Sequence, residues 1–146
     1  MEQMASPKLT VKELTRLLSA EFPHLFNSPS GYVIEDVRYC GCRVRKLYGA
    51  RSLRPGGTIA GTTMMGLADF AIYVAILGTI GWVPLTVTTN LTINFLKKPA
   101  ARDLLGEARL LKLGKRLAVG EIGIRSDGDE ELVAHATSTY SIPPQR

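Results

Sequence analysis

One stretch of the chain limits its possible folds more than any other feature. Between Thr58 and Leu85 the only charged residue is Asp69, although 21% of the 146 residues are charged. This stretch predicts a helix that is apolar nearly all round, and Gly78 and Gly81 are expected to end it. The residues that support the helix are Met64, Leu67, Ala68, Ala71, Ile72, Ala75 and Ile76. Such a helix is buried either in a protein core or in a membrane.

A membrane span is the first alternative for this helix. A carboxylate at the centre of a bilayer costs about 2.5–3.5 kcal/mol even on insertion scales, and Asp69 falls inside the helix. Glycine, threonine and proline residues at both ends also shorten the apolar span. We therefore predict a core helix and no insertion into a membrane.

The chain after this stretch has the alternation of β-strands. In residues 86–96 the two faces are assigned as Val87, Leu91, Ile93 and Phe95 on one side, and Thr88, Asn90, Thr92 and Asn94 on the other. Further strands are predicted at residues 104–113, 117–125 and 131–142, with turns at Gly114-Lys115 and at residues 126–129. This spacing indicates an antiparallel meander.

Small side chains recur on one face of the last two strands. These faces are Ala118, Gly120, Ile122 and Ile124, and then Leu132, Ala134, Ala136, Ser138 and Tyr140. Such residues let a helix lie close to the sheet, and the apolar helix needs a sheet to cover it. The sequence therefore predicts an α+β fold in which a curved antiparallel sheet wraps a long central helix.

An additional helix is expected before the sheet. Residues 8–22 have apolar residues at helical spacing, and Thr10 followed by Glu13 resembles a capping box. Residues 32–48 then predict two strands with a turn near Gly41. We divide the chain into an N-terminal helix with its connecting loop, residues 1–30, and a main domain, residues 31–146.

Cys40 and Cys42 are separated only by Gly41, which is too close for an ordinary disulfide. The sequence offers no second cluster of cysteine or histidine that would complete a zinc site. We expect no metal site and a reducing, cytoplasmic location.

Asp69 is the residue whose position suggests chemistry. No lysine or arginine lies within reach along the helix, and a buried carboxylate without a partner is costly. Asp69 could face a solvated groove or accept hydrogen bonds from backbone amides. It could equally be a general base or nucleophile in a cleft, where a backbone N–H near Gly57 or Gly61 would hold an oxyanion.

The net charge of +5 allows three interpretations: a solvated surface, an anionic ligand, or nucleic acid. Aromatic residues make up only 7% of the chain and no basic helix is evident, so nucleic acid is the weakest of the three. The cations that could bind the phosphates of an anionic ligand are Lys97, Lys98, Arg102, Lys115 and Arg116. The alternative is that these residues are exposed strand ends and a hairpin tip.

Two segments together resemble a known family. Residues 57–69 read Gly-Thr-Ile-Ala-Gly-Thr-Thr-Met-Met-Gly-Leu-Ala-Asp, and residues 87–99 read Val-Thr-Thr-Asn-Leu-Thr-Ile-Asn-Phe-Leu-Lys-Lys-Pro. They resemble the PaaI-like acyl-CoA thioesterases of the hotdog superfamily. Segments 107–116 and 134–140 continue the resemblance.

The resemblance implies a set of roles. A helix carboxylate that activates water or attacks the thioester falls on Asp69, and a glycine amide that polarises the thioester carbonyl falls on Gly61. A supporting hydroxyl falls on Thr88, with Thr89 as the neighbouring alternative. Many relatives have His-Gly-Gly where this chain has Ala60-Gly61-Thr62, so the imidazole is missing and the backbone donor remains.

The same resemblance implies an acyl-CoA substrate, no separate cofactor, and a homodimer or homotetramer whose sites lie between two subunits. The predicted activity is hydrolysis of an acyl-CoA to the free acid and CoA. The first rival is a non-catalytic protein that binds acyl-CoA or fatty acids. The second is a hotdog hydratase or dehydratase, which generally uses a histidine, and the sequence places none near Gly61 or Asp69.

Overall fold

The computed structural model describes residues 5–26, 30–49, 53–54 and 58–145. Gly57, which opens the family-like segment, lies outside the described residues. The elements in chain order are α1 Val11–Glu21, the short 3₁₀ helix η1 Pro23–Leu25, β1 Tyr32–Arg38, β2 Gly41–Lys46, β3 Leu53–Arg54, β4 Thr58–Ile59, α2 Gly61–Ile80, β5 Val87–Phe95, β6 Leu104–Leu113, β7 Leu117–Ser126 and β8 Leu132–Ser141.

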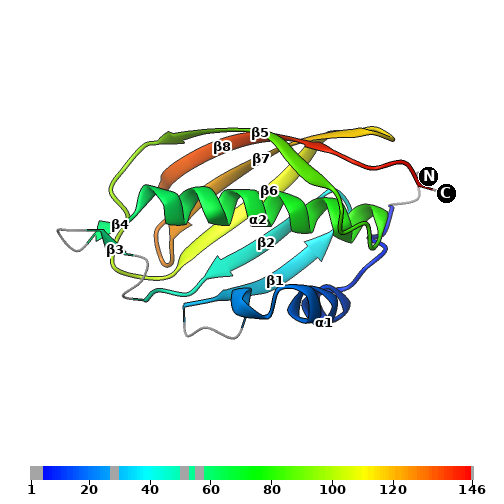
Figure 1. Ribbon diagram of the computed structural model, residues 1–146. Helices are drawn as coiled ribbons and strands as arrows, with labels where there is room; N and C mark the ends of the chain where they lie inside the picture. Colours follow the sequence, from blue (N-terminus) through cyan, green and yellow to red (C-terminus); the bar gives the residue numbers. More distant parts are fainter. Residues whose placement is uncertain (1–4, 27–29, 50–52, 55–57, 146) are drawn as a thin grey trace.

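Among the described residues, the large sheet has six antiparallel strands in the order β1-β2-β6-β7-β8-β5, and β3 pairs with β4 in a separate two-stranded sheet. The helix α2 lies across one face of the curved sheet, and α1 lies beside β1 at one of its edges (Figure 1). The predicted α+β architecture, a central helix wrapped by an antiparallel sheet with an extra N-terminal helix, is confirmed. This is the hotdog fold.

The helix α2 is long and apolar enough to cross a membrane, but 67% of its most apolar window is buried inside the fold. Glycines in the sheet allow the close contact that buries it. A Cβ added to Gly106 would lie 3.4 Å from Cγ of Leu67 and 2.8 Å from Cδ1 of Ile122, and one added to Gly120 would lie 3.0 Å from Cγ2 of Ile72. Gly120, which was predicted to face the helix, does so, and the alanines predicted on the same faces, Ala118, Ala134 and Ala136, are fully buried.

The prediction that Gly78 ends the helix is wrong, because α2 continues to Ile80 and Gly81, with φ 105°, provides the C-cap. Gly78 is needed for close packing instead, since an added Cβ would lie 2.6 Å from Cγ1 of Val37 on β1. Its carbonyl accepts the backbone N–H of Lys8 at 2.7 Å, which attaches the N-terminal segment to α2.

The N-terminal helix belongs to the same core as the sheet and α2. The predicted capping box is present: Glu13 N–H donates to Oγ1 of Thr10, and Thr10 N–H donates to the Glu13 carboxylate. Leu14 and Leu18 of α1 are fully buried in the main apolar core. The N-terminal helix is therefore packed into the fold of residues 31–146.

Two β-bulges change the predicted faces of β5 and of the start of β8. A register shift between Thr88 and Asn90 places Thr88 opposite Tyr140, and Leu91 opposite Ser138. Directly opposed residues share a face of the sheet, so Thr88 lies on the helix side and not on the side assigned from strict alternation.

The second shift, between Ile124 and Arg125, affects the start of β8. Val133 is buried and Leu132 is exposed, which reverses the prediction for Leu132.

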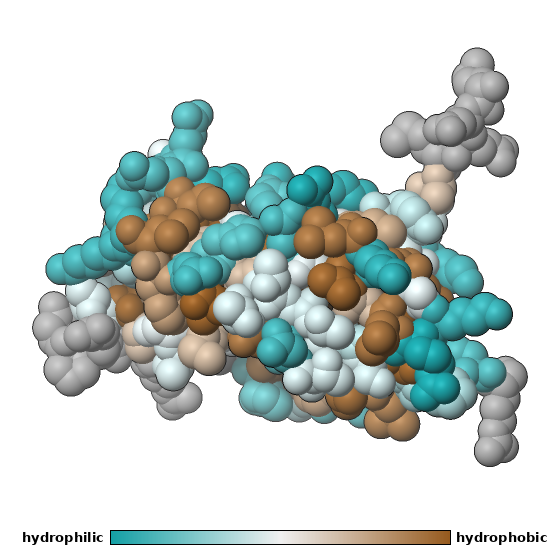
Figure 2. Space-filling model, turned by 90° about the horizontal axis from the view of Figure 1, so that it is seen from above, coloured by the Kyte–Doolittle hydropathy of each residue, from teal (hydrophilic) through white to brown (hydrophobic). Residues whose placement is uncertain are grey.

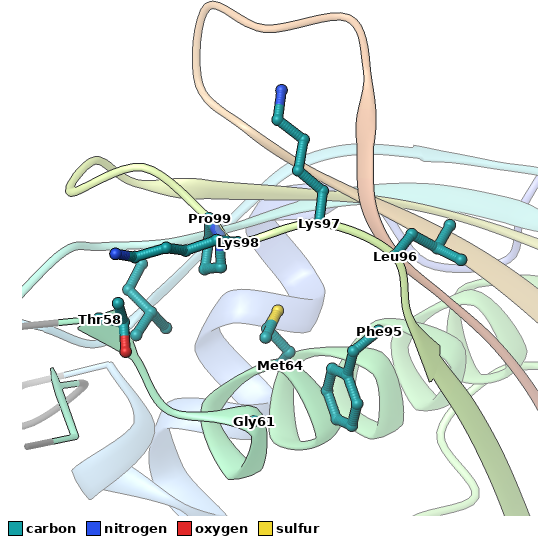
Figure 3. Close-up of a pocket in the computed structure, with 9 residues that line it drawn as sticks. Thr58, Gly61, Met64, Phe95, Leu96, Lys97, Lys98 and Pro99 are labelled. Atoms are coloured by element: carbon teal, nitrogen blue, oxygen red, sulfur yellow. The ribbon is translucent and has the colours of Figure 1, made fainter. Parts of the chain in front are cut away.

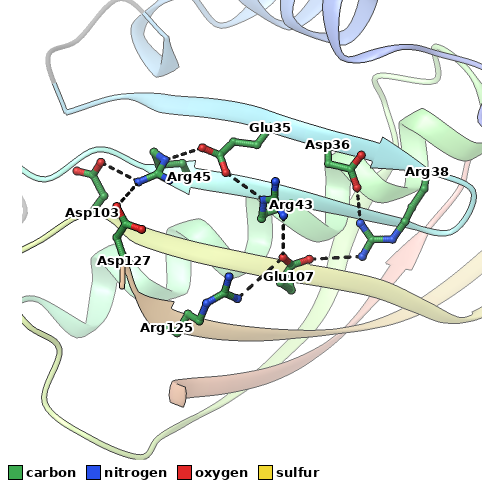
Figure 4. Close-up of polar contacts among 9 residues, drawn as sticks. All are labelled: Glu35, Asp36, Arg38, Arg43, Arg45, Asp103, Glu107, Arg125 and Asp127. Atoms are coloured by element: carbon green, nitrogen blue, oxygen red, sulfur yellow. Dashed lines mark hydrogen bonds and ion pairs between the residues drawn. The ribbon is translucent and has the colours of Figure 1, made fainter. Parts of the chain in front are cut away.

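The outer face of the sheet carries a network of ion pairs that spans four strands (Figure 4). Glu107 on β6 contacts Arg38, Arg43 and Arg125 at 3.4–3.9 Å. A second group joins Arg45 to Glu35, Asp103 and Asp127 at 2.6–3.2 Å. The charges of these strands therefore gather on the face opposite α2, and the apolar face is left to the helix.

Candidate active site

Asp69 lies on the side of α2 that the sheet does not cover. Most of the helix is buried, but Thr62 and Met65 are exposed, and Gly66, Asp69 and Tyr73 are half-buried. These positions recur every three or four residues, so they form one stripe along the helix. Asp69 is the only charged residue of α2, and it therefore meets solvent on the side that the sheet leaves open.

Two hydroxyl groups hold the Asp69 carboxylate. Oγ1 of Thr88 donates to Oδ1 at 2.6 Å, and the Tyr140 hydroxyl lies 2.5 Å from the same oxygen. The Tyr140 hydroxyl also lies 2.6 Å from the main-chain oxygen of Asp69. The bulge in β5 makes the first contact possible, because it turns Thr88 toward the helix.

A pocket of about 640 Å³ opens beside this carboxylate. Its wall is mainly aromatic and apolar, and the residues that line it are Phe22, Leu25, Tyr32, Gly66, Asp69, Phe70, Tyr73, Pro84, Thr86, Val87, Thr88 and Tyr140. Phe22 is the C-cap residue of α1 and Leu25 is the last residue of η1, so the N-terminal segment forms part of the wall.

Two tyrosines of this pocket are held in their neutral form. Burial, and then the negative charge of Asp69, raises the pKa of Tyr32 to about 12. The pKa of Tyr140 is raised further, chiefly by burial and then by Asp69. Both hydroxyls therefore remain hydrogen-bond donors at neutral pH.

Gly61 lies in a different pocket of the same chain. A second pocket, of about 700 Å³, is lined by Gly61, Met64, Phe95, Lys98 and five neighbours (Figure 3). The phenyl ring of Phe95 lies over the start of α2, and a Cβ added to Gly61 would be 3.2 Å from its Cζ. Gly61 and Asp69 are eight residues apart in the sequence. At the α-helical rise they are therefore separated by about 12 Å along the axis.

The start of α2 has the properties of an anion site. Ala60 is the N-cap and provides no side-chain hydrogen bond to the first turn. The first amide groups of a helix have no partner inside it, and the helix dipole favours negative charge there. The Gly61 N–H is thus suited to an anion, but the pocket of Asp69 in the same chain does not include it, and its role as an oxyanion donor stays a prediction.

The predicted cations fall into two groups at opposite ends of α2. Lys97 and Lys98 border the Gly61 pocket; Lys97 points away from the helix and pairs with Glu131 at 2.6 Å, whereas Lys98 extends toward Thr58 (Figure 3). Arg102 donates to the main-chain oxygen of Asp127 at 2.8 Å.

Lys115 and Arg116 border a third pocket beside Ile80 and Val83, near the C-terminal end of the helix. They are therefore not part of the group formed by the first three cations.

Several residues of the site were not predicted. Tyr140 is 71 residues from Asp69 in the sequence and was recognised only as an inward-facing strand position. Tyr32, Phe22 and Leu25 carry no local signal that would connect them with Asp69. Among the residues that the structure describes, no group of three or more histidine, cysteine, aspartate or glutamate side chains could hold a metal ion.

Comparison with known proteins identifies the family. Residues 56–133 match the model of the thioesterase superfamily. A Saccharolobus solfataricus protein whose name proposes an esterase is 32% identical over 136 residues, which cover 93% of this chain and 87% of the relative.

Solved structures agree with this match. A Silicibacter protein whose name proposes a thioesterase is 41% identical, with a TM-score of 0.87 and coverage of 97% of both chains. A Streptococcus pneumoniae protein, solved with coenzyme A and described as a hypothetical thioesterase, has the same fold, with a TM-score of 0.75, 21% identity and coverage of 90% of this chain and 98% of that one. The predicted family is confirmed, and the chain belongs to the thioesterase superfamily.

Proposed function

We propose that the protein is an acyl-CoA thioesterase in which Asp69 activates the attacking water. The observation that supports this proposal most directly is the environment of Asp69. Its Oδ1 accepts hydrogen bonds from two hydroxyls in a mainly aromatic and apolar pocket, and Oδ2 has no hydrogen-bond partner among the described residues. A carboxylate held in this way has one oxygen available to accept a proton from water.

In this mechanism the water oxygen attacks the thioester carbonyl carbon while Asp69 takes one of its protons. The Gly61 N–H donates to the oxyanion of the tetrahedral intermediate. The C–S bond then breaks, the acid is released, and the CoA thiolate leaves and takes up a proton. In a variant of this mechanism, Asp69 itself attacks the carbonyl carbon, and the C–S bond breaks to give an anhydride with Asp69 and the CoA thiolate. Water then hydrolyses the anhydride, which releases the acid and restores the Asp69 carboxylate.

The separation of Gly61 from Asp69 within one chain favours a site formed by two subunits. The strand β5 is an edge of the sheet, and edge strands need pairing or covering. In a symmetric antiparallel pair of β5 strands centred on Leu91, Thr88 of one subunit lies opposite position 94 of its partner. The Asp69 end of one subunit then adjoins the Gly61 end of the other.

The surface around β5 is suitable for such a contact. Leu85, Val87, Phe95 and Leu96 are 51–76% exposed, although all four are apolar. The face seen from above carries brown apolar patches and white side chains of intermediate hydropathy among scattered teal ones (Figure 2). We propose a homodimer through β5, which could associate further into a tetramer.

CoA is the proposed leaving group, and the relative from Streptococcus pneumoniae has this molecule bound. Lys97 and Lys98 follow β5 and line the Gly61 pocket, where they could contact its phosphates. Arg102 does not line that pocket and donates to the main-chain oxygen of Asp127, so we expect it to contribute less. Lys115 and Arg116 lie near the other end of α2, so we expect them to contribute less. The aromatic pocket beside Asp69 would hold the acyl group. We place this activity in the cytoplasm.

The main alternative is a protein that binds acyl-CoA without hydrolysing it. Release of free thiol from a panel of acyl-CoAs, measured with the purified wild type and Asp69→Asn, separates the two. We expect Asp69→Asn to lower kcat by at least about 100-fold, because general base catalysis is worth about 10²–10⁴-fold, while acyl-CoA still binds.

The substitution keeps the size of the side chain and its hydrogen-bonding capacity, so the fold should remain intact. Binding without turnover by the wild type would identify a binding protein. Near-normal turnover by Asp69→Asn would refute the role of Asp69.

A further inference from the structure

Tyr140 makes an unusual contact for a tyrosine in a sheet. Its side chain is 2% exposed and comes from β8, on the inner face of the sheet. Buried tyrosine hydroxyls usually find a hydrogen-bond partner. Here that partner is Asp69, the one charged residue of the central helix, through both its carboxylate and its main-chain oxygen.

The contact forms a clamp together with Thr88. Tyr140 and Thr88 are directly opposed in the β5–β8 ladder, so their hydroxyls leave neighbouring strands side by side. Both lie within 2.6 Å of Oδ1 of Asp69. A carboxylate oxygen has two lone pairs, and two donors occupy them. The plane of the carboxylate is thereby fixed, and Oδ2 is left for another partner.

The Tyr140 hydroxyl also joins the carboxylate to its own backbone. It has one hydrogen, which lies within reach of both Oδ1 and the main-chain oxygen of Asp69. The hydroxyl oxygen therefore stays beside both groups, and the side chain of Asp69 is restrained against rotation. Burial keeps Tyr140 protonated, with its pKa raised far above its usual value, so the donor persists at working pH.

We propose that Tyr140 is a positioning residue that holds the Asp69 carboxylate in the orientation needed to take a proton from water. This inference rests on the proposed thioesterase function. Tyr140 does not touch the reacting atoms in this scheme. It acts through Asp69, and the wild-type rate requires its hydroxyl as well as that of Thr88.

The hydroxyl can be removed with little change in packing. The Tyr140 ring lies against Tyr73, with 6.2 Å between centroids and 25° between planes, and Tyr140→Phe keeps this contact. Ser138→Ala is a matched control. Ser138 is 1% exposed, lies on the same strand and the same face, and donates to the main-chain oxygen of Asn90 on β5 at 2.7 Å. Each variant removes one buried hydroxyl of β8 that donates a hydrogen bond to a neighbouring element. Only the hydroxyl of Tyr140 contacts Asp69.

The experiment compares acyl-CoA hydrolysis by these variants, with thermal unfolding measured for each. Tyr140→Phe should lower kcat by about 10- to 100-fold, since hydrogen bonds to charged groups are strong, and should change KM little. Ser138→Ala should keep a kcat close to that of the wild type. In the Asp69→Asn background, Tyr140→Phe should have almost no further effect on kcat, because the group that it positions is gone.

Three results would overturn the proposal. They are a normal kcat in Tyr140→Phe, an equal loss of kcat in Ser138→Ala, and the same loss from Tyr140→Phe with and without Asp69. If Tyr140→Phe does not fold, fluorotyrosine at position 140 keeps the ring and strengthens the donor, and a kcat identical to that of the wild type would then refute the role. A wild type without turnover would refute the thioesterase function itself, whereas loss in Asp69→Asn without loss in Tyr140→Phe would refute only this inference.

Discussion

Replacement of Gly61 by proline tests whether its backbone N–H stabilises an oxyanion. Gly61 is the first residue of α2, a position where proline is favoured, because its missing N–H is unpaired within the helix. Ala60, with φ −66° and ψ 145°, already has the extended conformation that a residue before proline requires. Gly61→Pro should therefore fold and lack only the donor.

Gly61→Ala is the matched control for this change. Either substitution adds a Cβ about 3.2 Å from Cζ of Phe95, so the phenyl ring must move by a few tenths of an ångström in both. Only alanine keeps the N–H. Loss of one oxyanion donor costs about 10²–10³-fold in kcat, or about 2.7–4 kcal/mol. We expect Gly61→Pro to lose this factor relative to Gly61→Ala in an acyl-CoA hydrolysis assay.

Mixed dimers test whether the two groups come from different subunits. When Gly61→Pro and Asp69→Asn chains exchange at equal concentration, about half of the dimers are mixed, and each has one site with both groups intact. Activity should therefore return to about a quarter of the wild-type value. If activity does not recover although subunit exchange is proven, the two-subunit site is refuted. If Gly61→Pro and Gly61→Ala lose equal factors in kcat, the oxyanion role of the Gly61 N–H is refuted.

The remaining predictions concern binding and stability. Lys98→Glu should raise KM for acyl-CoA several-fold and leave kcat nearly unchanged, because phosphate contacts are equal in the ground and transition states; a thioester without the nucleotide should be much less affected. Phe22→Ala should enlarge the acyl pocket and shift the ratio of kcat/KM toward longer acyl groups by about tenfold, which a chain-length series measures. The pKa of Glu121 is lowered by hydrogen bonds from His135 and Arg109, so its contribution to stability is complete above its ordinary pKa of 4.5 and is lost as the pH falls through the lower native value. The difference in unfolding free energy between the wild type and Glu121→Gln should accordingly shrink as the pH falls below about 4.5 in denaturant titrations; a difference that does not shrink below this pH would contradict this.

The sequence could predict the fold because its strongest signals are local and agree with one another. The apolar stretch around Asp69 requires burial, and the alternation after residue 85 supplies strands with small inward residues that can cover it. The capping box of Thr10 and Glu13 is likewise contained within four residues and is present as predicted. The prediction that Gly78 ends the helix was wrong, because it depended on contacts between elements: Gly78 packs against Val37 of β1 within the helix.

The candidate site was likewise predictable from the sequence only in part. Asp69 was identifiable as the single charge in an apolar helix, and Gly61 and Thr88 followed from a resemblance to a family that the comparisons confirm. Alternation placed Thr88 on the wrong face, because a one-residue bulge in β5 reverses the side chains before it. Only the folded chain brings Thr88 to Asp69.

The sequence by itself determined that a long helix must be buried, that one carboxylate lies within it, and that an antiparallel sheet is available to cover it. Tertiary structure alone decided that Tyr140 and Thr88 share one oxygen of Asp69, that α1 and η1 complete the pocket beside it, and that Gly61 lies in a separate pocket. The physical reason is that hydrophobic periodicity is set by neighbours three or four positions away, or two in a strand. Hydrogen bonds between residues 71 positions apart depend instead on strand register, and a single bulge is enough to change it.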